Sequence, residues 1–251
     1  MAGWRDCRHD ARDSLPSVQV SVSFTPSERL AAPVAIAIDV LRATSTIAQA
    51  LASGYGRVLC CAEIDEAREV AAGNQPAILG GERACVRIPG FDVGNSPQEF
   101  TGEPIGGTLV LTTTNGTRLL VAAAERCETV LLGSLLNPGA VTRAARESGS
   151  DRIVVLCAGV RGAFVFDDAY CAGRIAAALR GEPDDSAVAA IRLAESFPDH
   201  VSGLSPAQSA RNLVNAGLES DIAWCARESV LDVVPRVAGR VGSAVEVVAT
   251  R

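Results

Sequence analysis

The stretch VAIAIDVLRATSTI, from Val34 to Ile47, constrains the fold more than any other part of this sequence. It opens with an uninterrupted apolar run, VAIAI, which has the length and the β-branched content of a strand buried on both faces. Asp39 follows where this strand ends, and Arg42, Thr44 and Ser45 come just before text that is typical of a helix. Because ligands of open α/β sheets sit beyond the carboxyl ends of the strands, the stretch predicts a site for a metal ion and an anion at a strand-to-helix turn.

The rest of the sequence alternates between short apolar runs and amphipathic segments, which favours an α/β sheet with helices on both faces. Strands are expected at residues 18–24, 34–38, 58–61, 77–79, 109–111, 129–132, 153–157 and 244–249. Helices are expected at about residues 47–51, 64–72, 118–124, 137–148, 169–179, 186–195, 205–216 and 222–227. We predict a three-layer α/β/α fold with a largely buried central sheet. It would form a single domain of residues 17–251 after a flexible leader of residues 1–16, and residues 81–97 would form an ordered functional loop.

The charged residues narrow the range of functions. The net charge is −6 and no basic stripe is present, which argues against a nucleic-acid partner. All 23 basic residues are arginine, so the chain has no lysine for Schiff-base chemistry or for a lysine-containing phosphate loop. Arginine is therefore the only long side-chain cation that can bind an anionic ligand.

The cysteines and histidines argue against a zinc site. None of the eight cysteines belongs to a C-x-x-C pair, and the two histidines are His9, in the leader, and His200, which is expected in a loop. No signal peptide is visible, and no apolar run reaches the roughly 20 residues of a membrane span. We expect a cytoplasmic protein without a membrane partner, and the sequence leaves a homodimer open as its assembly state.

Polar groups follow four of the predicted strands and are expected to meet at one rim of the sheet. They are Asp39 with Arg42, Glu82 with Arg83, the turn Thr112–Thr117, and the pair Asp167-Asp168 at a helix start. Carboxylates from separate strand ends are the oxygen ligands that Mg²⁺ prefers. Arginines and a turn rich in hydroxyl and N–H groups suit a phosphorylated anion. The pattern predicts metal-assisted hydrolysis of a small phosphorylated acid.

Each of these motifs also has a structural alternative. Thr44 or Ser45 can cap a helix without binding a ligand, and Asp39 can be only a turn residue. Asp167 can also be a simple helix cap. Glu82 and Arg83 can form a local surface ion pair. The turn Thr112–Thr117 can be only a strand edge followed by an Asn-Gly turn. The residues alone leave these alternatives open.

Several motifs together carry a resemblance to a known family. They are DVLRATSTI at Asp39–Ile47, GGER at Gly80–Arg83, GFDVGNSP at Gly90–Pro97, TTTNGT at Thr112–Thr117 and CAG at Cys157–Gly159. With these motifs the chain resembles the 2-phosphosulfolactate phosphatase family of coenzyme M biosynthesis, over about residues 34–235. The resemblance implies a three-layer α/β fold, a magnesium ion, and the release of phosphate from a three-carbon sulfonated acid to leave sulfolactate.

The resemblance also implies roles for individual residues. The expected catalytic residues are Asp39, Glu82 and Asp168, and the expected metal ligands are Asp39, Glu82, Asp167 and Asp168. The expected substrate-binding residues are Arg42, Thr44, Ser45, Arg83, Asn95, Thr113, Thr114, Asn115, Gly116 and Thr117. One departure is the pair Asp167-Asp168, where the family leads us to expect Glu-Asp.

Two other functions compete with this hypothesis. A phosphatase of the haloacid dehalogenase type would use Asp39 as a nucleophile, but it needs a second acid where this chain has Leu41 and commonly a lysine. A non-catalytic binder or sensor of phosphorylated or sulfonated anions would keep Arg42, Arg83 and the threonine turn without needing the carboxylates. Phosphate release measured with and without Mg²⁺ separates the three.

Overall fold

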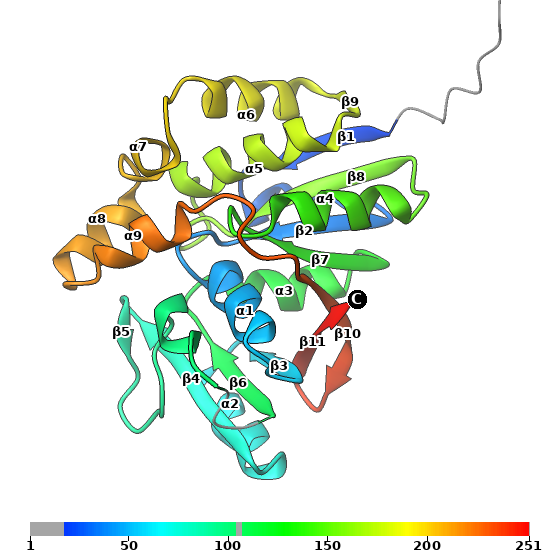
Figure 1. Cartoon of the computed structure of the whole chain (residues 1–251). Coiled ribbons are helices and arrows are strands. Elements are labelled where there is room, and N and C mark those ends of the chain that lie inside the picture. Colours follow the sequence, from blue (N-terminus) through cyan, green and yellow to red (C-terminus); the bar gives the residue numbers. More distant parts are fainter. Residues whose placement is uncertain (1–17, 104–106, 251) are drawn as a thin grey trace, which may run out of the picture.

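One sheet runs through the described part of the protein, and helices cover it on both sides (Figure 1). The computed structural model describes residues 18–103 and 107–250, so the predicted leader, residues 1–16, lies outside the described residues. The strands are β1 (Gln19–Ser23), β2 (Val34–Ile38), β3 (Arg57–Cys61), β4 (Ala77–Arg83), β5 (Val86–Arg87), β6 (Thr108–Thr112), β7 (Thr129–Gly133), β8 (Arg152–Cys157), β9 (Glu182–Pro183), β10 (Val234–Val241) and β11 (Ala244–Thr250). The α-helices are α1 (Ala43–Ala52), α2 (Ile64–Gly73), α3 (Gly116–Ala124), α4 (Pro138–Glu147), α5 (Phe166–Leu179), α6 (Asp185–Glu195), α7 (His200–Leu204), α8 (Gln208–Asn215) and α9 (Ser220–Cys225), and the short 3-10 helices are η1 (Pro26–Glu28) and η2 (Pro97–Phe100).

The sheet contains two groups of parallel strands. Its order is β5-β4-β6-β3-β11-β10-β7-β2-β8-β1-β9. Strands β7, β2, β8 and β1 form one parallel group, and β3, β6 and β4 form the other. The antiparallel hairpin β10–β11 joins them, because β10 pairs with β7 and β11 pairs with β3, both antiparallel. The two parallel groups therefore run in opposite directions along the sheet.

Strand β2 lies in the interior of its group, as its sequence predicts. It pairs in parallel with β7 on one side and with β8 on the other, and all five of its residues are buried. This placement explains the continuous apolar run, since a strand covered on both faces has no need for polar positions. The α/β fold with a central sheet is thereby confirmed.

Helices α1 and α3 pack between the two parallel groups. Helix α1 contacts β7 and β10 as well as β3 and β11, and α3 contacts both β2 and β3. Figure 1 shows α1 in the middle of the molecule, with β2 and β7 on one side and β3 on the other. Ile47 of α1 and Leu120 of α3 share one apolar cluster with Ala35 of β2 and Val58 of β3. The starts of these two helices are thus held next to each other.

The remaining helices cover the outer faces of the sheet. Helices α4 and α5 pack against β7, β2, β8 and β1, and α2 packs against β3, β4 and β6. Helix α6 packs on α5 and β1, and α7, α8 and α9 continue from there to the side of the molecule where β5 lies (Figure 1). The C-terminal helices are therefore close to the carboxyl ends of the strands that precede α1 and α5.

Several sequence-based boundaries were wrong. Residues 81–97 were expected as a loop, but β4 extends to Arg83 and β5 pairs with it as an antiparallel strand. The predicted helix 205–216 begins only at Gln208, because Pro206 separates α8 from α7. His200 begins α7 and does not lie in a loop. Strand β10 was missed because its sequence, VPRVAGRV, contains Pro, Gly and two Arg and has no clear alternation.

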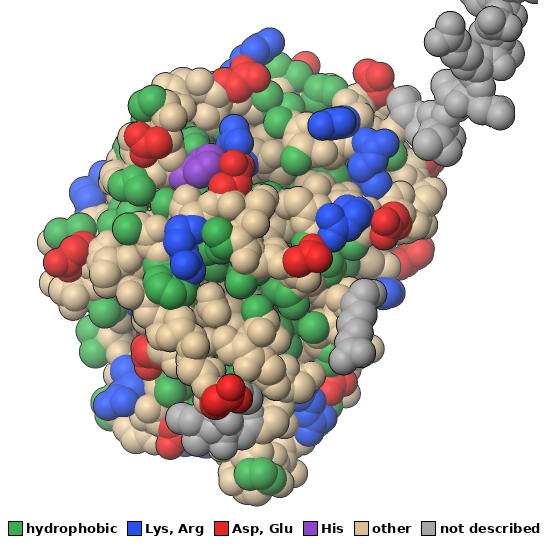
Figure 2. Space-filling model, viewed as in Figure 1, with side chains coloured by type: hydrophobic (Ala, Val, Ile, Leu, Met, Phe, Trp, Pro, Cys, Tyr) green, Lys and Arg blue, Asp and Glu red, His purple; other side chains and the backbone are tan. Residues whose placement is uncertain are grey.

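Within the described ranges, none of the helices is long and apolar enough to cross a membrane. Acidic and basic side chains are interspersed over the face of the molecule that Figure 2 shows, without a broad patch of one sign.

The contact between α5 and α6 provides a test of this packing. A Cβ added to Gly173 of α5 would lie 2.0 Å from the carbonyl oxygen of Ala190 in α6. Gly173→Ala should therefore destabilise the protein by about 1–3 kcal/mol, as overpacking usually does. Gly73→Ala, at the end of α2, meets no atom within 4 Å and should be neutral or stabilising by up to about 1 kcal/mol. Urea unfolding of both variants measures the difference, and equal stabilities would contradict the close helix contact.

Candidate active site

A polar cavity of about 570 Å³ lies where the two groups of strands meet α8. Its walls include Asp39 after β2, Glu82 in β4, Thr114 after β6, Arg161 after β8 and Asn212 in α8. The sheet, although its two groups run in opposite directions, thus delivers groups from both to one cavity. Three of the four predicted groups therefore contribute to the cavity, and the pair Asp167-Asp168 does not line it.

The structure places about half of the predicted site residues at the cavity. The predicted residues that line it are Asp39, Arg42, Glu82, Asn95, Thr114 and Asn115. The predicted residues that do not line it are Thr44, Ser45, Arg83, Thr113, Gly116, Thr117, Asp167 and Asp168. Most of the second set shape the turns that hold the first set in place.

Asp39 is held by the turn between β2 and α1. The hydroxyl of Thr44 accepts the backbone N–H of Asp39 (3.2 Å) and donates to its carbonyl oxygen (2.9 Å), while the N–H of Ala43 donates to the carboxylate Oδ1 (3.2 Å). Burial is the largest cause that raises the pKa of Asp39 to about 6, and the negative charge of Glu82 raises it as well. Backbone hydrogen bonds and the positive charge of Arg42 lower this pKa in part. Asp39 can therefore exchange a proton near neutral pH.

Glu82 is held by backbone groups from two different segments. Its Oε1 accepts the N–H of Thr114 (2.8 Å) and its Oε2 accepts the N–H of Cys85 (2.8 Å). The side chain is 7% exposed, and it lines the same cavity as Asp39. The carboxylate is thus fixed in orientation by the turn after β6 and by the turn between β4 and β5.

The turn Thr112–Thr117 presents only part of its polar groups to the cavity. Thr113 and Thr117 bond to each other: each hydroxyl accepts the other residue's backbone N–H, at 3.2 and 3.1 Å. A Cβ on Gly116 would lie 2.5 Å from Oδ2 of Asp39, so only glycine fits there without a shift. These contacts leave Thr114 and Asn115 as the residues of the turn that line the cavity.

Two buried polar atoms at the cavity have no hydrogen-bond partner among the described residues. They are Oδ1 of Asn95 and Oγ1 of Thr114. An unpaired buried polar atom costs free energy, and such atoms at a cavity are usually satisfied by a ligand, an ion or water. Both residues were predicted to bind substrate.

Arg42 lines the cavity but is already engaged in a buried ion pair. Its Nη1 lies 2.6 Å from Oδ2 of Asp221, with side-chain exposures of 3% and 1%, and its Nη2 donates to the carbonyl oxygen of Cys85 (3.1 Å). Asp221, in α9, also accepts hydrogen bonds from the hydroxyl of Ser96 (2.5 Å) and from the side-chain amide of Gln98 (2.8 Å). The pair joins the turn after β2 to α9 and to the loop before η2.

Arg83 points to other partners. Its guanidinium donates to the carbonyl oxygen of Glu82 (2.7 Å) and to the hydroxyl of Thr112 (3.1 Å). The sequence-based hypothesis treated Arg42 and Arg83 as two equivalent anion-binding cations. The structure does not bring them together in this way, because strand alternation turns Arg83 to the other side of β4 from Glu82.

Asp168 connects two strand ends from behind the cavity. Its Oδ1 accepts the N–H of Val40 (2.9 Å) and its Oδ2 accepts the N–H of Gly159 (3.0 Å). Burial raises the pKa of Asp168 well above its ordinary value, and the charges of Asp167 and Asp39 raise it further. Its predicted catalytic role stays a prediction, and this position favours a positioning role between β2 and β8.

Asp167 is buried beneath α8. Its Oδ1 accepts the hydroxyl of Ser209 (3.1 Å), and Ser209 itself lines the cavity. Burial raises the pKa of Asp167 to about 7, and the charge of Asp39 contributes.

Across the described residues, no three His, Cys, Asp or Glu side chains are grouped so that they could hold a metal ion, so the predicted set of four carboxylate ligands is not assembled.

A magnesium ion fits a smaller set of donors. Asp39 and Glu82 bring two carboxylates to the cavity, and the same cavity is lined by Asn95 and Thr114, each of which has a buried oxygen without a partner among the described residues. Mg²⁺ takes oxygen ligands, and it usually has one or two protein carboxylates, with water and substrate phosphate completing its coordination. The chemistry of these donors therefore suits Mg²⁺.

Sequence reasoning missed two groups at the cavity. Gln208, Asn212 and Asn215 of α8 line it, and their spacing of four and three residues is the signal of one polar helix face. Arg161, in the Val160–Gly162 turn after β8, also lines it. The only sequence signal for Arg161 is its place just after the Cys157–Gly159 motif.

The fold and the cavity define an α/β protein with two buried carboxylates, Asp39 and Glu82, in the wall of one cavity. The sequence model of the 2-phosphosulpholactate phosphatase family matches residues 20–240. Similar proteins include those named "Probable 2-phosphosulfolactate phosphatase" from Thermus thermophilus, 37% identical over 90% of this chain and 98% of the relative, and from Symbiobacterium thermophilum, 39% identical over 85% of this chain and 95% of the relative. A relative of the same name from Clostridium novyi is 33% identical over 86% of this chain and 94% of its own length. The chain belongs to the 2-phosphosulfolactate phosphatase family.

The raised pKa of Asp167 predicts a pH-dependent stability of the metal-free protein. The folded state keeps this proton up to a pH of about 7, whereas the unfolded chain loses it near the ordinary value of 3.8. Folding therefore binds a proton in this window, and stability falls as pH rises through it and levels off above. In Asp167→Asn this contribution is absent, so the variant should lose less stability than wild type between pH 5 and pH 8.

Thermal unfolding in excess EDTA at several pH values measures this effect. Asp65→Asn is the matched control, since Asp65 is 89% exposed on α2, and it should follow the wild-type profile. Parallel profiles for wild type and Asp167→Asn would show that the Asp167 carboxyl does not titrate as its burial implies.

Proposed function

We propose that the protein is a magnesium-dependent phosphatase that hydrolyses 2-phosphosulfolactate to sulfolactate and phosphate. Its membership of the family supports the substrate, because the relatives carry that name. The observation that carries the chemistry is that Asp39 and Glu82, from the two opposed groups of strands, line one polar cavity. The reaction consumes one water: its oxygen bonds to phosphorus, the bond from phosphorus to the substrate oxygen breaks, and that oxygen takes up a proton.

The charge balance of the cavity supports a metal ion. Asp39 and Glu82 would repel a phosphorylated substrate if they met it as two bare carboxylates. When bound, Mg²⁺ supplies positive charge beside the phosphoryl oxygens and so makes this arrangement favourable. We propose Asp39 and Glu82 as its protein ligands, with the oxygens of Asn95 and Thr114 beside it.

Each charged residue of the cavity has a separate proposed role. Glu82 is fixed by two backbone N–H groups, which suits a ligand that must not move. Asp39 is held toward the cavity by the N–H of Ala43, and as a ligand it would bind the ion in its charged form. Arg42 uses one N–H for Asp221 and one for Cys85, and its other N–H donors can bind phosphoryl oxygens.

A non-catalytic anion binder is the weaker candidate. Such a protein gains nothing from buried carboxylates in its binding cavity, since each lowers the affinity for an anion. Asp39 is only 9% exposed and Glu82 only 7%, so solvent does little to screen them. The names of the relatives also point to an enzyme and not to a sensor.

We also propose a cytoplasmic location and a place in coenzyme M biosynthesis. All seven cysteines in the described part of the chain are free, which suits a reducing compartment, while Cys7 lies outside that part. The resemblance to the 2-phosphosulfolactate phosphatase family of coenzyme M biosynthesis implies that the product is sulfolactate. A homodimer stays a prediction.

The direct test of the proposal is phosphate release from 2-phosphosulfolactate by the purified protein. We expect turnover with Mg²⁺ and none in excess EDTA, with recovery on adding Mg²⁺ back, because the acids at the cavity need a cation to accept the substrate. Turnover by protein shown to be metal-free would overturn the metal requirement. No turnover with any divalent cation would overturn the proposed activity.

Removing the charge of either acid should also stop the reaction. Asp39→Asn and Glu82→Gln are each expected to lower kcat by about two orders of magnitude or more, as loss of a preorganised charge at a reacting centre often does. Asp39→Asn is the cleaner variant, because its amide can keep an oxygen toward the N–H of Ala43. In Glu82→Gln one backbone N–H of Thr114 or Cys85 must face an NH₂ group, so its stability has to be measured as well.

The control for both variants is Asp65→Asn, on the exposed surface of α2. Steady-state kinetics on folded protein decides the outcome. Near wild-type kcat in Asp39→Asn would show that this acid only supports the turn between β2 and α1.

A further inference from the structure

The cavity needs a positive charge that the residues discussed so far do not supply. On the proposed function, the substrate carries a phosphate, a carboxylate and a sulfonate. Asp39 and Glu82 add negative charge and would be balanced by the metal ion, while Arg42 is neutralised by Asp221 at 2.6 Å. Arg83 does not line the cavity. At least one anionic group of the substrate is therefore without a protein cation in this set.

Arg161 is the arginine at the cavity with an uncommitted side chain. It lines the cavity, and its guanidinium makes no ion pair or hydrogen bond with another residue of ranges 18–103 and 107–250. The other arginine that lines the cavity, Arg42, is paired with Asp221. Arg161 is also exposed, so that it stands at the mouth of the cavity and not in its floor.

The backbone of Arg161 is fixed although its side chain is free. Asn115 accepts the N–H of Arg161 with its side-chain oxygen (2.9 Å). Val160 and Ala163 close the turn with two backbone hydrogen bonds of 3.0 Å. Arg161 itself has a φ of 52°, a left-handed conformation that is uncommon for residues other than glycine. The turn thus fixes where the arginine side chain begins, next to the Asn115 side chain that lines the same cavity.

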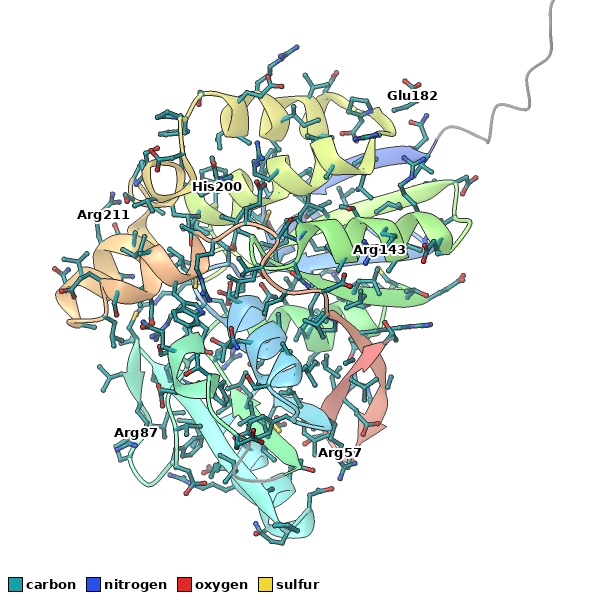
Figure 3. All side chains as sticks on the ribbon, in the orientation of Figure 1. Arg57, Arg87, Arg143, Glu182, His200 and Arg211 are labelled. Atoms are coloured by element: carbon teal, nitrogen blue, oxygen red, sulfur yellow. The ribbon has the colours of Figure 1, made fainter. Side chains whose placement is uncertain are left out.

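Helix α8 supplies a neutral donor to the same cavity. Arg211 donates to Oε1 of Gln208 (3.0 Å), and Nε2 of Gln208 donates to Oδ1 of Asn212 (2.9 Å). This chain of hydrogen bonds uses the oxygen of Asn212 and leaves its NH₂ group as the free end. Figure 3 shows Arg211 on α8, where the chain begins. Because Asn212 lines the cavity, the chain orients an N–H donor in its wall.

We propose that Arg161 and Asn212 form a subsite for the sulfonate of the substrate. In a 2-phosphorylated sulfolactate, phosphate and carboxylate share one carbon, and the sulfonate lies one carbon further out. With the phosphate at Asp39 and Glu82, the sulfonate is the group that reaches farthest toward the mouth, where Arg161 stands. A sulfonate spreads its charge over three oxygens, and the planar guanidinium together with an amide NH₂ group offers several N–H donors to them.

The first experiment compares substrates that differ only in the sulfonate. In Arg161→Met, kcat/KM for 2-phosphosulfolactate should fall by roughly ten- to a hundredfold, the size of a lost charge-assisted hydrogen bond. For 2-phospholactate, which lacks the sulfonate, kcat/KM should change by less than about twofold. Asn212→Leu removes the NH₂ group without adding a charge, so it should show a smaller loss in the same direction, confined to 2-phosphosulfolactate.

The matched control is Arg143→Met, an arginine of α4 that pairs with Asp232 on the surface at 2.6 Å and does not line the cavity. It should leave both substrates unaffected. Equal losses on the two substrates in Arg161→Met would place this residue at the phosphate or carboxylate. No loss on either substrate would remove it from the site. Both outcomes overturn the sulfonate subsite.

A binding measurement keeps the subsite distinguishable from the phosphatase activity. Titration calorimetry with sulfolactate and with lactate, in the presence of Mg²⁺, needs no turnover. Sulfolactate should bind wild type at least about tenfold more tightly than Arg161→Met, whereas lactate should not distinguish them. If wild type hydrolyses neither phosphorylated acid, the proposed activity fails, while the titration still decides the subsite. Equal binding of sulfolactate to wild type and Arg161→Met would overturn it.

Discussion

The buried ion pair between Arg42 and Asp221 is the interaction on which the rest of the site depends. Both side chains are almost fully removed from solvent, and their charged atoms lie 2.6 Å apart. Removing one partner of such a pair typically costs about 3–5 kcal/mol, because the other charge stays buried and unpaired. The pair connects the turn after β2, the loop around Ser96 and helix α9, and so it holds three distant parts of the chain around one cavity. It also neutralises most of the charge of Arg42, and this is the reason for proposing Arg161 as a second cation for the substrate.

The buried acids lower the folding stability of the protein. Asp39, Asp167 and Asp168 all have raised pKa values, with burial as the largest cause. A carboxyl whose pKa rises on folding destabilises the folded state at neutral pH relative to an ordinary one. Such groups are common at functional sites, where a metal ion or substrate compensates them. Asp168 is partly compensated already, since two backbone N–H groups at the ends of β2 and β8 donate to it.

The sequence predicts the part of the site that local patterns encode. The apolar run before Asp39 marks a buried strand, and its polar continuation marks a turn at the edge of the sheet; both are present in the structure. What the sequence does not predict depends on partners far along the chain. Asp221 pairs with Arg42 although the two residues lie 179 positions apart, and no local sequence pattern near either residue predicts the pair. Strand β10 exists because β11 and β7 pair with it, so its own residues carry little strand signal. Arg83 was assigned to the cavity by its position next to Glu82, but adjacent residues of a strand point to opposite sides.

On the proposed function, a metal ion at Asp39 and Glu82 and the guanidinium of Arg161 at the mouth of the cavity would hold the two ends of a sulfonated substrate. A crystal structure of the protein with Mg²⁺ and sulfolactate tests it most directly. We expect the ion in contact with carboxylate oxygens of Asp39 and Glu82, and the sulfonate in contact with the guanidinium of Arg161. A metal ion bound away from both acids, or sulfolactate with its sulfonate turned away from Arg161, would contradict it.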